Sequence, residues 1–523
     1  MTQDDDNLEN SALDWSPDQM RRLGYAVVDA VVARHAGLRE SAPWRGGDRS
    51  ELEALFREPC PEEGRDPAGV LARATEEILP LAGRIDHPRF MAFVPASPVW
   101  PAILADWLTT GFNIFQGTWL GGAGPSQIEL VVLDWFRDWL GMPQGAGGLF
   151  TSGGSAANLT AVVAARHRAV GPFAGSGGRP GPDPRSFRAY VSAQAHSSVG
   201  RALRIAGISS EAVRWIPVDD GLRMRPDALR EAMARDRDAG LLPGLVVGNG
   251  GATNTGIVDP LNTLGAEARA HGAWFHVDAA YGGFAILAPG GPELLSGIGE
   301  ADSVTLDPHK WLFQPYECGC LMVRDPKDLE SAFRVSAEYL QDTELGLEHV
   351  NFGDRGLQLT RSFRALKVWV TLQTLGRRAL AQAVADAIEQ AEHAAERIRE
   401  EARLRVLAEP SMSIVCFQAV PTDASERDGE SLDSFNQAIQ DQVVSEGTAM
   451  ISSTRIGGRF ALRLCVLNHR TTRDDVDAVL DRIIALASGT GTSDLPAQVT
   501  VPLTKGKGPD ALPTADPAGG LPA

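Results

Sequence analysis

Between about residues 100 and 390, the chain alternates short apolar runs with longer segments in which apolar positions recur at helical spacing. The apolar runs have the length of strands and comprise residues 189–194, 241–249, 273–280, 303–307 and 318–325. Because these runs are apolar on both faces and alternate with helices, they predict an α/β fold with a mostly parallel sheet covered by helices. Such sheets bind ligands at the carboxyl ends of their strands.

The regions on either side of this central part differ in pattern. Ser16 and Pro17 have the residue types of a helix start, and an amphipathic stretch follows them. Apolar runs on both sides of an amphipathic segment at 431–446 predict a smaller α/β unit. The predicted organisation is a disordered acidic leader (1–14), a helical segment (15–99), a large domain (100–390), a small C-terminal domain (391–487) and a disordered tail (488–523).

Composition and charge narrow the class of protein. The formal net charge of −18 over 523 residues disfavours binding to nucleic acid or to an anionic membrane. No apolar run approaches the roughly 20 residues that cross a bilayer, and the chain starts with an acidic, polar stretch instead of a secretory signal. Five cysteines in such a long chain do not form a disulfide framework. We therefore expect a cytoplasmic protein without nucleic-acid or membrane partners.

Two charged residues lie where the predicted sheet would place a ligand. Lys310, in DPHKWL, follows strand 303–307, and Asp278, in HVDAAYGG, lies near the end of the preceding strand. Taken alone, such a lysine usually extends its amine to solvent, and such an aspartate usually bonds to a loop. Taken together, the ends of adjacent parallel strands present an amine and a carboxylate to one ligand.

Pyridoxal phosphate is a ligand that uses both groups. Its aldehyde forms a Schiff base with a lysine, and a carboxylate such as Asp278 keeps its ring nitrogen protonated. We expect the apolar surroundings to favour the neutral, nucleophilic form of Lys310. Gly154 and Ser155, in TSGGSAANL, precede an Ala-rich helix whose N-terminus suits the phosphate.

Other residues near the predicted strand ends are further candidates for the site. His196 is either a helix-capping residue or an imidazole stacked on the cofactor ring, with Ala280 beneath the other face. Thr253 lies in a Gly-rich loop that directly follows a strand. Ser303 and His309 lie close to Lys310 in the sequence and are candidate hydrogen-bond donors.

These motifs resemble those of the group II pyridoxal-phosphate-dependent amino acid decarboxylases, which include the aromatic-L-amino-acid, tyrosine, histidine and glutamate decarboxylases. The resemblance covers about residues 15–487 and includes, in order, HPRFMAFVPASP, GGSAANL, QAHSSV, HVDAAYGG, DPHKWL and RSFRALKVW. It implies PLP fold type I, decarboxylation of an L-amino acid, and a homodimer with shared active sites in which residues 15–99 pack on the partner.

The resemblance also implies roles for individual residues. Lys310 is implied as the Schiff-base residue, Asp278 as the partner of the ring nitrogen, and His196 as the ring that stacks on the cofactor. Further cofactor contacts are implied for Gly154, Ser155, Thr253, Ser303 and His309. The implied substrate-pocket residues favour an aromatic substrate because they are mostly apolar: Phe93, Val94, Pro95 and Trp119.

Two positions leave alternatives open. Phe352 lies in an expected lid at 340–356, where the aromatic amino acid decarboxylases of this family have a tyrosine thought to donate a proton. Related plant enzymes with phenylalanine there resemble aldehyde synthases, so oxygen-dependent conversion to an aldehyde is the alternative activity. Arg463 is either a ligand of the substrate carboxylate, as in aminotransferases, or a packing residue of the small domain. Aminotransferase, carbon–sulfur lyase and non-catalytic binding functions also remain open.

Overall fold

The computed structural model describes residues 13–171, 182–334, 346, 349–421 and 429–489. Nearly all of the predicted leader and tail and about half of the expected lid lie outside these residues. Among the described residues, no helix is both long enough and apolar enough to cross a membrane.

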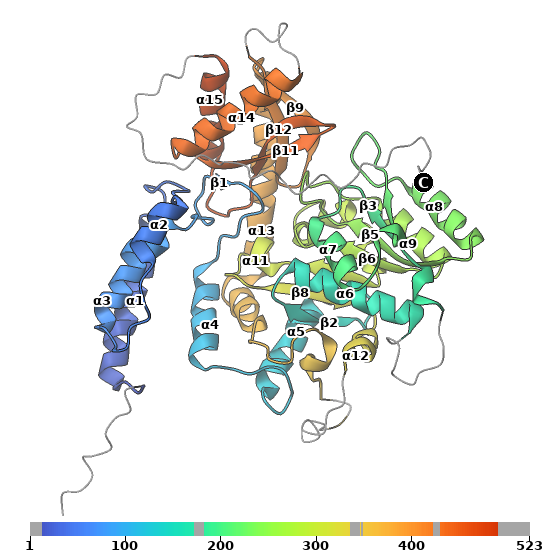
Figure 1. Ribbon diagram of the computed structural model, residues 1–523, viewed down its shortest axis with the longest axis horizontal. Helices are drawn as coiled ribbons and strands as arrows, with labels where there is room; N and C mark the ends of the chain where they lie inside the picture. The colour runs from blue at the N-terminus through green and yellow to red at the C-terminus, as the bar shows by residue number, and fades with distance from the viewer. Residues whose placement is uncertain (1–12, 172–181, 335–345, 347–348, 422–428, 490–523) are drawn as a thin grey trace, which may run out of the picture.

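A seven-stranded sheet forms the centre of the large domain (Figure 1). Its strands, in spatial order, are β2 (Gly147–Thr151), β8 (Gly319–Val323), β7 (Ser303–Leu306), β6 (Trp274–Asp278), β5 (Leu242–Asn249), β3 (Phe187–Ser192) and β4 (Val213–Ile216). Only β8 runs against the others, since it pairs antiparallel with both β2 and β7. The mostly parallel sheet predicted from the apolar runs is therefore confirmed.

Helices pack on both faces of this sheet. The side chain of Asn158 in α6 contacts His276 of β6, whereas the glycine of α9 at position 265 lies against the neighbouring Phe275. Because successive strand residues point to opposite faces, α6 and α9 cover opposite sides of the sheet. The helices of this domain are α4 (Trp100–Gly111), α5 (Ala123–Leu140), α6 (Gly154–Val170), α7 (Ser197–Ile205), α8 (Pro226–Asp238), α9 (Leu261–Ala270), α10 (Gly291–Leu294), α11 (Pro308–Trp311) and α12 (Lys327–Phe333).

A smaller five-stranded sheet forms the second domain. Its order is β1 (Phe90–Met91), β11 (Met450–Ile456), β12 (Arg459–Cys465), β10 (Ile414–Ala419) and β9 (Leu404–Ser411), and α14 (Gly429–Ser445) and α15 (Arg473–Ala487) belong to the same unit. The edge strand β1 comes from the segment that the sequence assigned to the N-terminal helices. Helix α13 (Ala365–Glu400) runs from one domain into the other, so the boundary expected at residue 390 falls inside a helix.

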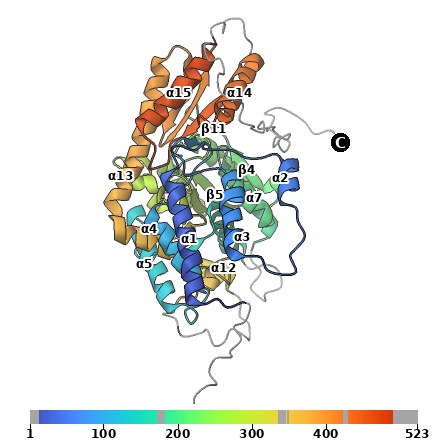
Figure 2. The ribbon, with the colours of Figure 1, turned by 90° about the vertical axis from the view of Figure 1, so that its left-hand side faces the viewer.

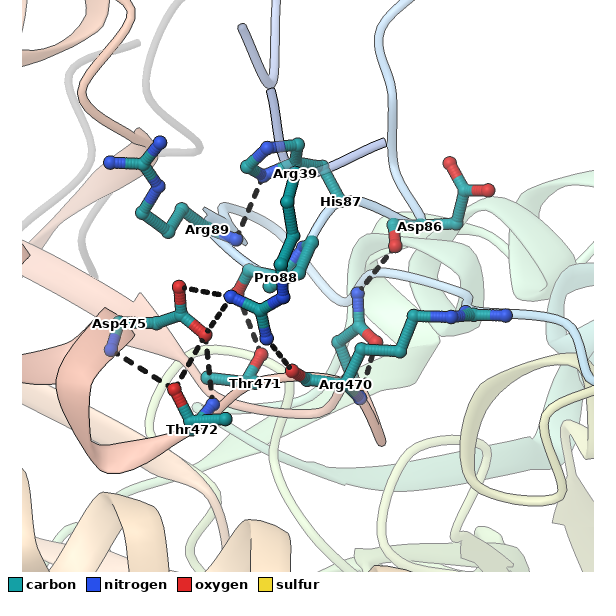
Figure 3. Close-up of polar contacts among 10 residues, drawn as sticks. Arg39, Asp86, His87, Pro88, Arg89, Arg470, Thr471, Thr472 and Asp475 are labelled. Carbon is teal, nitrogen blue, oxygen red and sulfur yellow. Dashed lines mark hydrogen bonds and ion pairs between the residues drawn. The ribbon is translucent and has the colours of Figure 1, made fainter. Parts of the chain in front are cut away.

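The N-terminal helices α1 (Pro17–Ala36), α2 (Arg49–Phe56) and α3 (Pro67–Arg73) stand beside the main body (Figures 1 and 2). The side chains of Ser16 and Gln19 form a capping box at the start of α1, which confirms the predicted helix start. Just beyond α1, Arg39 donates to both carboxylate oxygens of Asp475 at 2.9 and 3.0 Å (Figure 3). Nearby, Thr471 donates to the carbonyl oxygen of Pro88 at 2.6 Å. These bonds fix the segment that enters β1 against the small domain.

Candidate active site

A cavity of about 310 Å³ lies at the carboxyl ends of the parallel strands, where the sequence predicted a ligand site. Its lining comes from the segments that follow β2, β3, β5, β6 and β7, and from helix α6. The lining residues are Ser152, Gly153, Gly154, Ser155, Ala156, Asn158, His196, Ser198, Thr253, Asp278, Ala280, Asp307, His309 and Lys310.

Lys310 is held on the short helix α11, directly after β7. Its Nζ atom lies 2.9 Å from Oδ2 of Asp307, whose side chain is buried. Burial acts to lower the pKa of Lys310, but the ion pair with Asp307 outweighs it and raises the pKa above the usual range of a lysine. Burial favours the neutral amine as expected from the sequence, but the carboxylate of Asp307, which the sequence reasoning did not place there, favours the protonated form.

Asp278 ends β6, and its carboxylate faces the cavity from the strand next to β7. Its Oδ2 accepts a hydrogen bond from Nδ2 of Asn158 at 2.8 Å, and its Oδ1 accepts one from the backbone N–H of Ala280 at 3.2 Å. The register pairs Asp278 with Thr305, so the ends of β6 and β7 lie side by side. This arrangement brings the carboxylate and the amine of Lys310 to one cavity, as the strand order predicts.

His196 and Thr253 reach the cavity from two other strand ends. His196 is the N-cap of α7, and its Nδ1 accepts from the backbone N–H of Ser198 at 3.3 Å. Burial and the nearby Lys310 lower the pKa of His196, so its ring is neutral near pH 7. The histidine thus both caps a helix and lines the cavity, and the two interpretations weighed from the sequence are compatible. Thr253 lies in the loop after β5.

The Gly-Gly-Ser turn forms a narrow entry to helix α6 at one side of the cavity. No side chain caps this helix, so the first-turn N–H groups of Gly154 and Ser155 are available to bind an anion. A Cβ atom at Gly154 would lie 2.9 Å from Cβ of Ala280 and 3.0 Å from Oδ2 of Asp307. Only glycine fits so close an approach. His309 also lines the cavity, and its ring makes an edge contact with Tyr316 at 4.9 Å.

Three residues named from the sequence for the cofactor, the proton transfer or the substrate carboxylate lie away from the cavity lining. Ser303 starts β7, at the opposite end of that strand, and its hydroxyl bonds with Trp274 and His276. The ring of Phe352 is fully buried in the large-domain core, 4.9 Å from the guanidinium of Arg361. Neither residue is part of the described lining of this cavity.

Arg463 is the third of these residues. Its guanidinium donates to the carbonyl oxygens of Thr253 at 2.7 Å, Asn254 at 2.9 Å and Phe93 at 2.6 Å. A further bond reaches Oγ of Ser452 at 3.2 Å. With its donors directed to these oxygens and its side chain 4% exposed, Arg463 holds backbone segments together and is not offered to a substrate carboxylate.

The expected substrate residues lie outside the lining of this cavity. Phe93 has a left-handed backbone with φ 54°, and its ring is 63% exposed. Val94 is half-buried against the large-domain core, and Pro95 is buried. Trp119 makes an edge contact with the ring of His349 at 5.1 Å, and its backbone N–H donates to Asn351. Among the described residues, these four side chains therefore do not form a wall of this cavity.

Sequence reasoning missed four polar side chains of the lining: Ser152, Asn158, Ser198 and Asp307. Each lies within a motif that the sequence had singled out, namely TSGGSAANL, QAHSSV and DPHKWL. The signal was the presence of a polar residue in an otherwise apolar segment next to a predicted strand end. A single sequence does not tell which of these side chains points to the ligand.

The cavity fits pyridoxal phosphate by the chemistry of its donors and acceptors. A buried lysine, an open helix N-terminus and a carboxylate on the adjacent strand meet the needs of the aldehyde, the phosphate and the ring nitrogen. Together with the mostly parallel sheet and the small C-terminal domain, this site defines an enzyme of PLP fold type I.

Comparison with known proteins identifies the family. Residues 50–420 match the model described as the pyridoxal-dependent decarboxylase conserved domain, so the chain belongs to the pyridoxal-dependent decarboxylases. It is a carboxy-lyase whose cofactor is pyridoxal phosphate.

Individual relatives and a solved structure agree with this family. The chain is 37% identical to aromatic-L-amino-acid decarboxylase of Bacillus atrophaeus, over 91% of this chain and 97% of the relative. It is 30% identical to phenylacetaldehyde synthase of Petunia hybrida, over 86% of this chain and 90% of the relative. The crystal structure of Oryza sativa TDC with PLP and tryptamine superimposes with a TM-score of 0.85 at 26% identity, covering 91% of this chain and 99% of the other.

Proposed function

We propose that this enzyme removes the carboxylate of an aromatic L-amino acid as carbon dioxide and releases the corresponding amine. The observation that carries the proposal is the convergence of Lys310, Asp278 and His196 on one cavity at adjacent strand ends. The similarity to an aromatic-L-amino-acid decarboxylase over most of both chains supports the aromatic substrate class.

Each lining group has a distinct task in this proposal. Bound pyridoxal phosphate supplies an electron sink for the bond that breaks, and Lys310 is the amine that attaches to its aldehyde. Asp278 pairs with the ring nitrogen and keeps a proton there, because a carboxylate beside a pyridinium stabilises its charge. The open N-terminus of α6 binds the phosphate, and His196 lies against the ring with a neutral imidazole.

The preference for an aromatic substrate rests on apolar side chains near the site. Arg463 bonds to the carbonyls of both Phe93 and Thr253, so the exposed ring of Phe93 is tied to a residue of the cavity lining. We propose Phe93, Val94, Pro95 and Trp119 as the apolar contacts of the substrate. Apolar contacts in a substrate pocket discriminate between side chains of similar size by only about 1–3 kcal/mol. Activity on more than one aromatic amino acid is therefore expected.

The decisive experiment is a product assay over the twenty amino acids plus dihydroxyphenylalanine and diaminobutyrate, with peroxide measured in parallel. We expect amine and carbon dioxide in equal amounts from aromatic substrates. Lys310→Ala should abolish turnover and prevent trapping of the cofactor by borohydride. Undiminished turnover in that variant, or activity confined to non-aromatic substrates, would contradict the proposal.

A second candidate is the oxygen-dependent conversion of the amino acid to an aldehyde, with ammonia, carbon dioxide and peroxide. The similarity to a phenylacetaldehyde synthase favours it, and so does phenylalanine at position 352. Phe352 is buried and does not line the cavity described in one chain, and this weakens the argument from phenylalanine at position 352. Peroxide in a one-to-one ratio to consumed substrate would make this the main activity.

We further propose that the enzyme is a cytoplasmic homodimer in which residues 15–99 pack on the partner. Large apolar side chains are exposed on the N-terminal helix and on α4, among them Met20, Tyr25, Leu108 and Phe112. Such exposed apolar surface is typical of a subunit interface. All five cysteines are free, and four of them are buried, which suits a reducing compartment. Light scattering of the purified protein tests the dimer, and cell fractionation tests the location.

A further inference from the structure

One buried side chain, Asn158 on α6, bonds to four other residues around the cavity. Its Nδ2 donates to Oδ2 of Asp278 at 2.8 Å and to Oγ of Ser198 at 2.9 Å. Its Oδ1 accepts from the hydroxyl of Thr305 at 2.7 Å and lies 3.0 Å from Nε2 of His276. Asn158 is 1% exposed, so these bonds use its donors and acceptor without competition from bulk water.

The chemistry of its neighbours fixes the direction of every bond in this network. A carboxylate only accepts, so the amide nitrogen must face Asp278 and the amide oxygen must face His276. The oxygen only accepts, so Nε2 of His276 carries a proton. Burial lowers the pKa of His276 to about 4, which keeps the ring neutral and leaves Nδ1 without a proton. Nδ1 therefore accepts from the hydroxyl of Ser303 at 2.8 Å.

A second branch of the network determines the proton position on His196. The hydroxyl oxygen of Ser198 accepts from Asn158, and its proton is directed to Nδ1 of His196 at 2.8 Å. The same ring nitrogen accepts from the backbone N–H of Ser198. The single proton of the neutral ring thus lies on Nε2.

We infer that Asn158 is a positioning residue of the cofactor site, which fixes the orientation of Asp278 and, through the hydroxyl of Ser198, supports the tautomer of His196 that the backbone N–H of Ser198 also favours. The inference rests on the proposed function, because it assigns these two side chains to the ring nitrogen and the ring face. Asn158 itself acts through them. The network explains why a strand with a histidine and an aspartate on one face is stable inside the sheet: each polar atom has a partner of matching direction.

Three variants separate this role from general support of the fold. Asn158→Leu removes all four bonds at similar volume. Asn158→Asp keeps the shape but places a second carboxylate against Asp278. Thr160→Val is the matched control: Thr160 is buried on the same helix and bonds only to the carbonyl of Ala156, outside the network.

The main measurement is the dissociation constant of the apoenzyme for pyridoxine 5′-phosphate, which has the ring and the phosphate but no aldehyde to react with Lys310. We expect Asn158→Leu to weaken this binding about ten- to hundredfold, since Asp278 loses a donor in a buried site. Binding of inorganic phosphate at the start of the same helix should change less than about threefold, and Thr160→Val should match the native enzyme in both.

The pH dependence supplies a second readout. The titratable groups around position 158 and the cavity are Asp278, His276, His196, Asp307, His309 and Lys310, and they are the same in the native enzyme and in Asn158→Asp. The dissociation constant of Asn158→Asp for pyridoxine 5′-phosphate, divided by that of the native enzyme, therefore reports the ionisation of the new carboxyl group. We expect this ratio to fall towards one as the pH is lowered, because a protonated acid at position 158 again donates to Oδ2 of Asp278.

The outcomes distinguish the inference from the proposed function. Equal weakening of pyridoxine phosphate and inorganic phosphate in Asn158→Leu, or unchanged binding of both, would overturn the role of Asn158. If Asn158→Leu does not fold, a ratio for Asn158→Asp that does not vary with pH would overturn it. A native enzyme that binds pyridoxine phosphate no better than inorganic phosphate would contradict the proposed placement of the ring itself.

Discussion

At the scale of single residues, the ion pair between Lys310 and Asp307 governs how readily the amine becomes a nucleophile. Asp307 raises the pKa of Lys310, so at neutral pH the amine is protonated and has no free electron pair. Oδ1 of Asp307 has no hydrogen-bond partner among the described residues. Asp307→Asn removes the charge at nearly constant shape, and the amide nitrogen can occupy the position of that oxygen.

We expect Asp307→Asn to accelerate covalent attachment of pyridoxal phosphate at neutral pH. The pKa of Lys310 falls when its anionic partner is lost, so the rate should reach its plateau at lower pH than in the native enzyme. Stopped-flow absorbance across a pH series measures the shift. Asp302→Asn, which alters a partly exposed ion pair with Arg168, is the control. A shift of the profile to higher pH would contradict the assignment of Asp307.

Arg463 carries the second prediction at this scale. Its buried guanidinium bonds to three carbonyl oxygens from separate parts of the chain, and hydrogen bonds to charged groups are stronger than neutral ones. Arg463→Met should lower the free energy of unfolding by about 2–4 kcal/mol, because the carbonyls are left unsatisfied. Urea unfolding of the apoenzyme measures the loss.

Arg455→Met provides the comparison for this effect. Arg455 lies on the neighbouring strand β11 and is exposed, paired with Asp433, so its replacement should change the unfolding free energy by less than about 0.5 kcal/mol. If Arg463→Met is as stable as Arg455→Met and instead shows only a raised KM, the side chain binds substrate.

At the scale of helices and strands, the sequence predicted the parts of the fold that local pattern controls. The runs ending at Asp278 and before Lys310 are long and apolar, and topology then brings the ends of parallel strands together without further information. Strand β1 has two residues, too few for any pattern. The carbonyl partners of Arg463 lie about 210 and 370 residues away in the chain. No local signal in the sequence therefore shows whether this arginine bonds to backbone carbonyl groups or to a substrate carboxylate.

The turn at Phe352–Arg355 gives the prediction at this scale. The ring of Phe352 packs under Arg361, which is itself paired with buried Glu129 at 2.7 Å. Phe352→Tyr therefore adds a polar hydroxyl to a fully buried ring and should lower the free energy of unfolding by about 1–3 kcal/mol. The ratio of amine to aldehyde should not change. A rise in that ratio, measured by product analysis, would show that position 352 supplies a proton to the reaction.

At the scale of the whole molecule, the exposed face of α4 argues for association of two chains. Leu104, Leu108 and Phe112 are spaced four residues apart and are 40%, 53% and 75% exposed, so they form one apolar stripe. Trp107 and Gly111 complete an apolar hollow of about 560 Å³ with them. The N-terminal helices stand beside the body (Figure 1). They carry further exposed apolar residues. A stripe of this kind is unfavourable in water unless another surface covers it.

Leu108→Asp should therefore shift the protein from dimer to monomer, because the dimer would bury an unpaired charge while the monomer leaves it solvated. Leu294→Asp is the control, because this leucine is 38% exposed on α10, away from the stripe on α4. It should leave the molecular mass of the assembly unchanged. Light scattering over a concentration series measures both variants. Because the proposed substrate residues lie outside the cavity lining among the described residues, we also expect the monomer to retain cofactor but lose most of its turnover. A monomeric variant with full activity would show instead that a single chain builds the complete site.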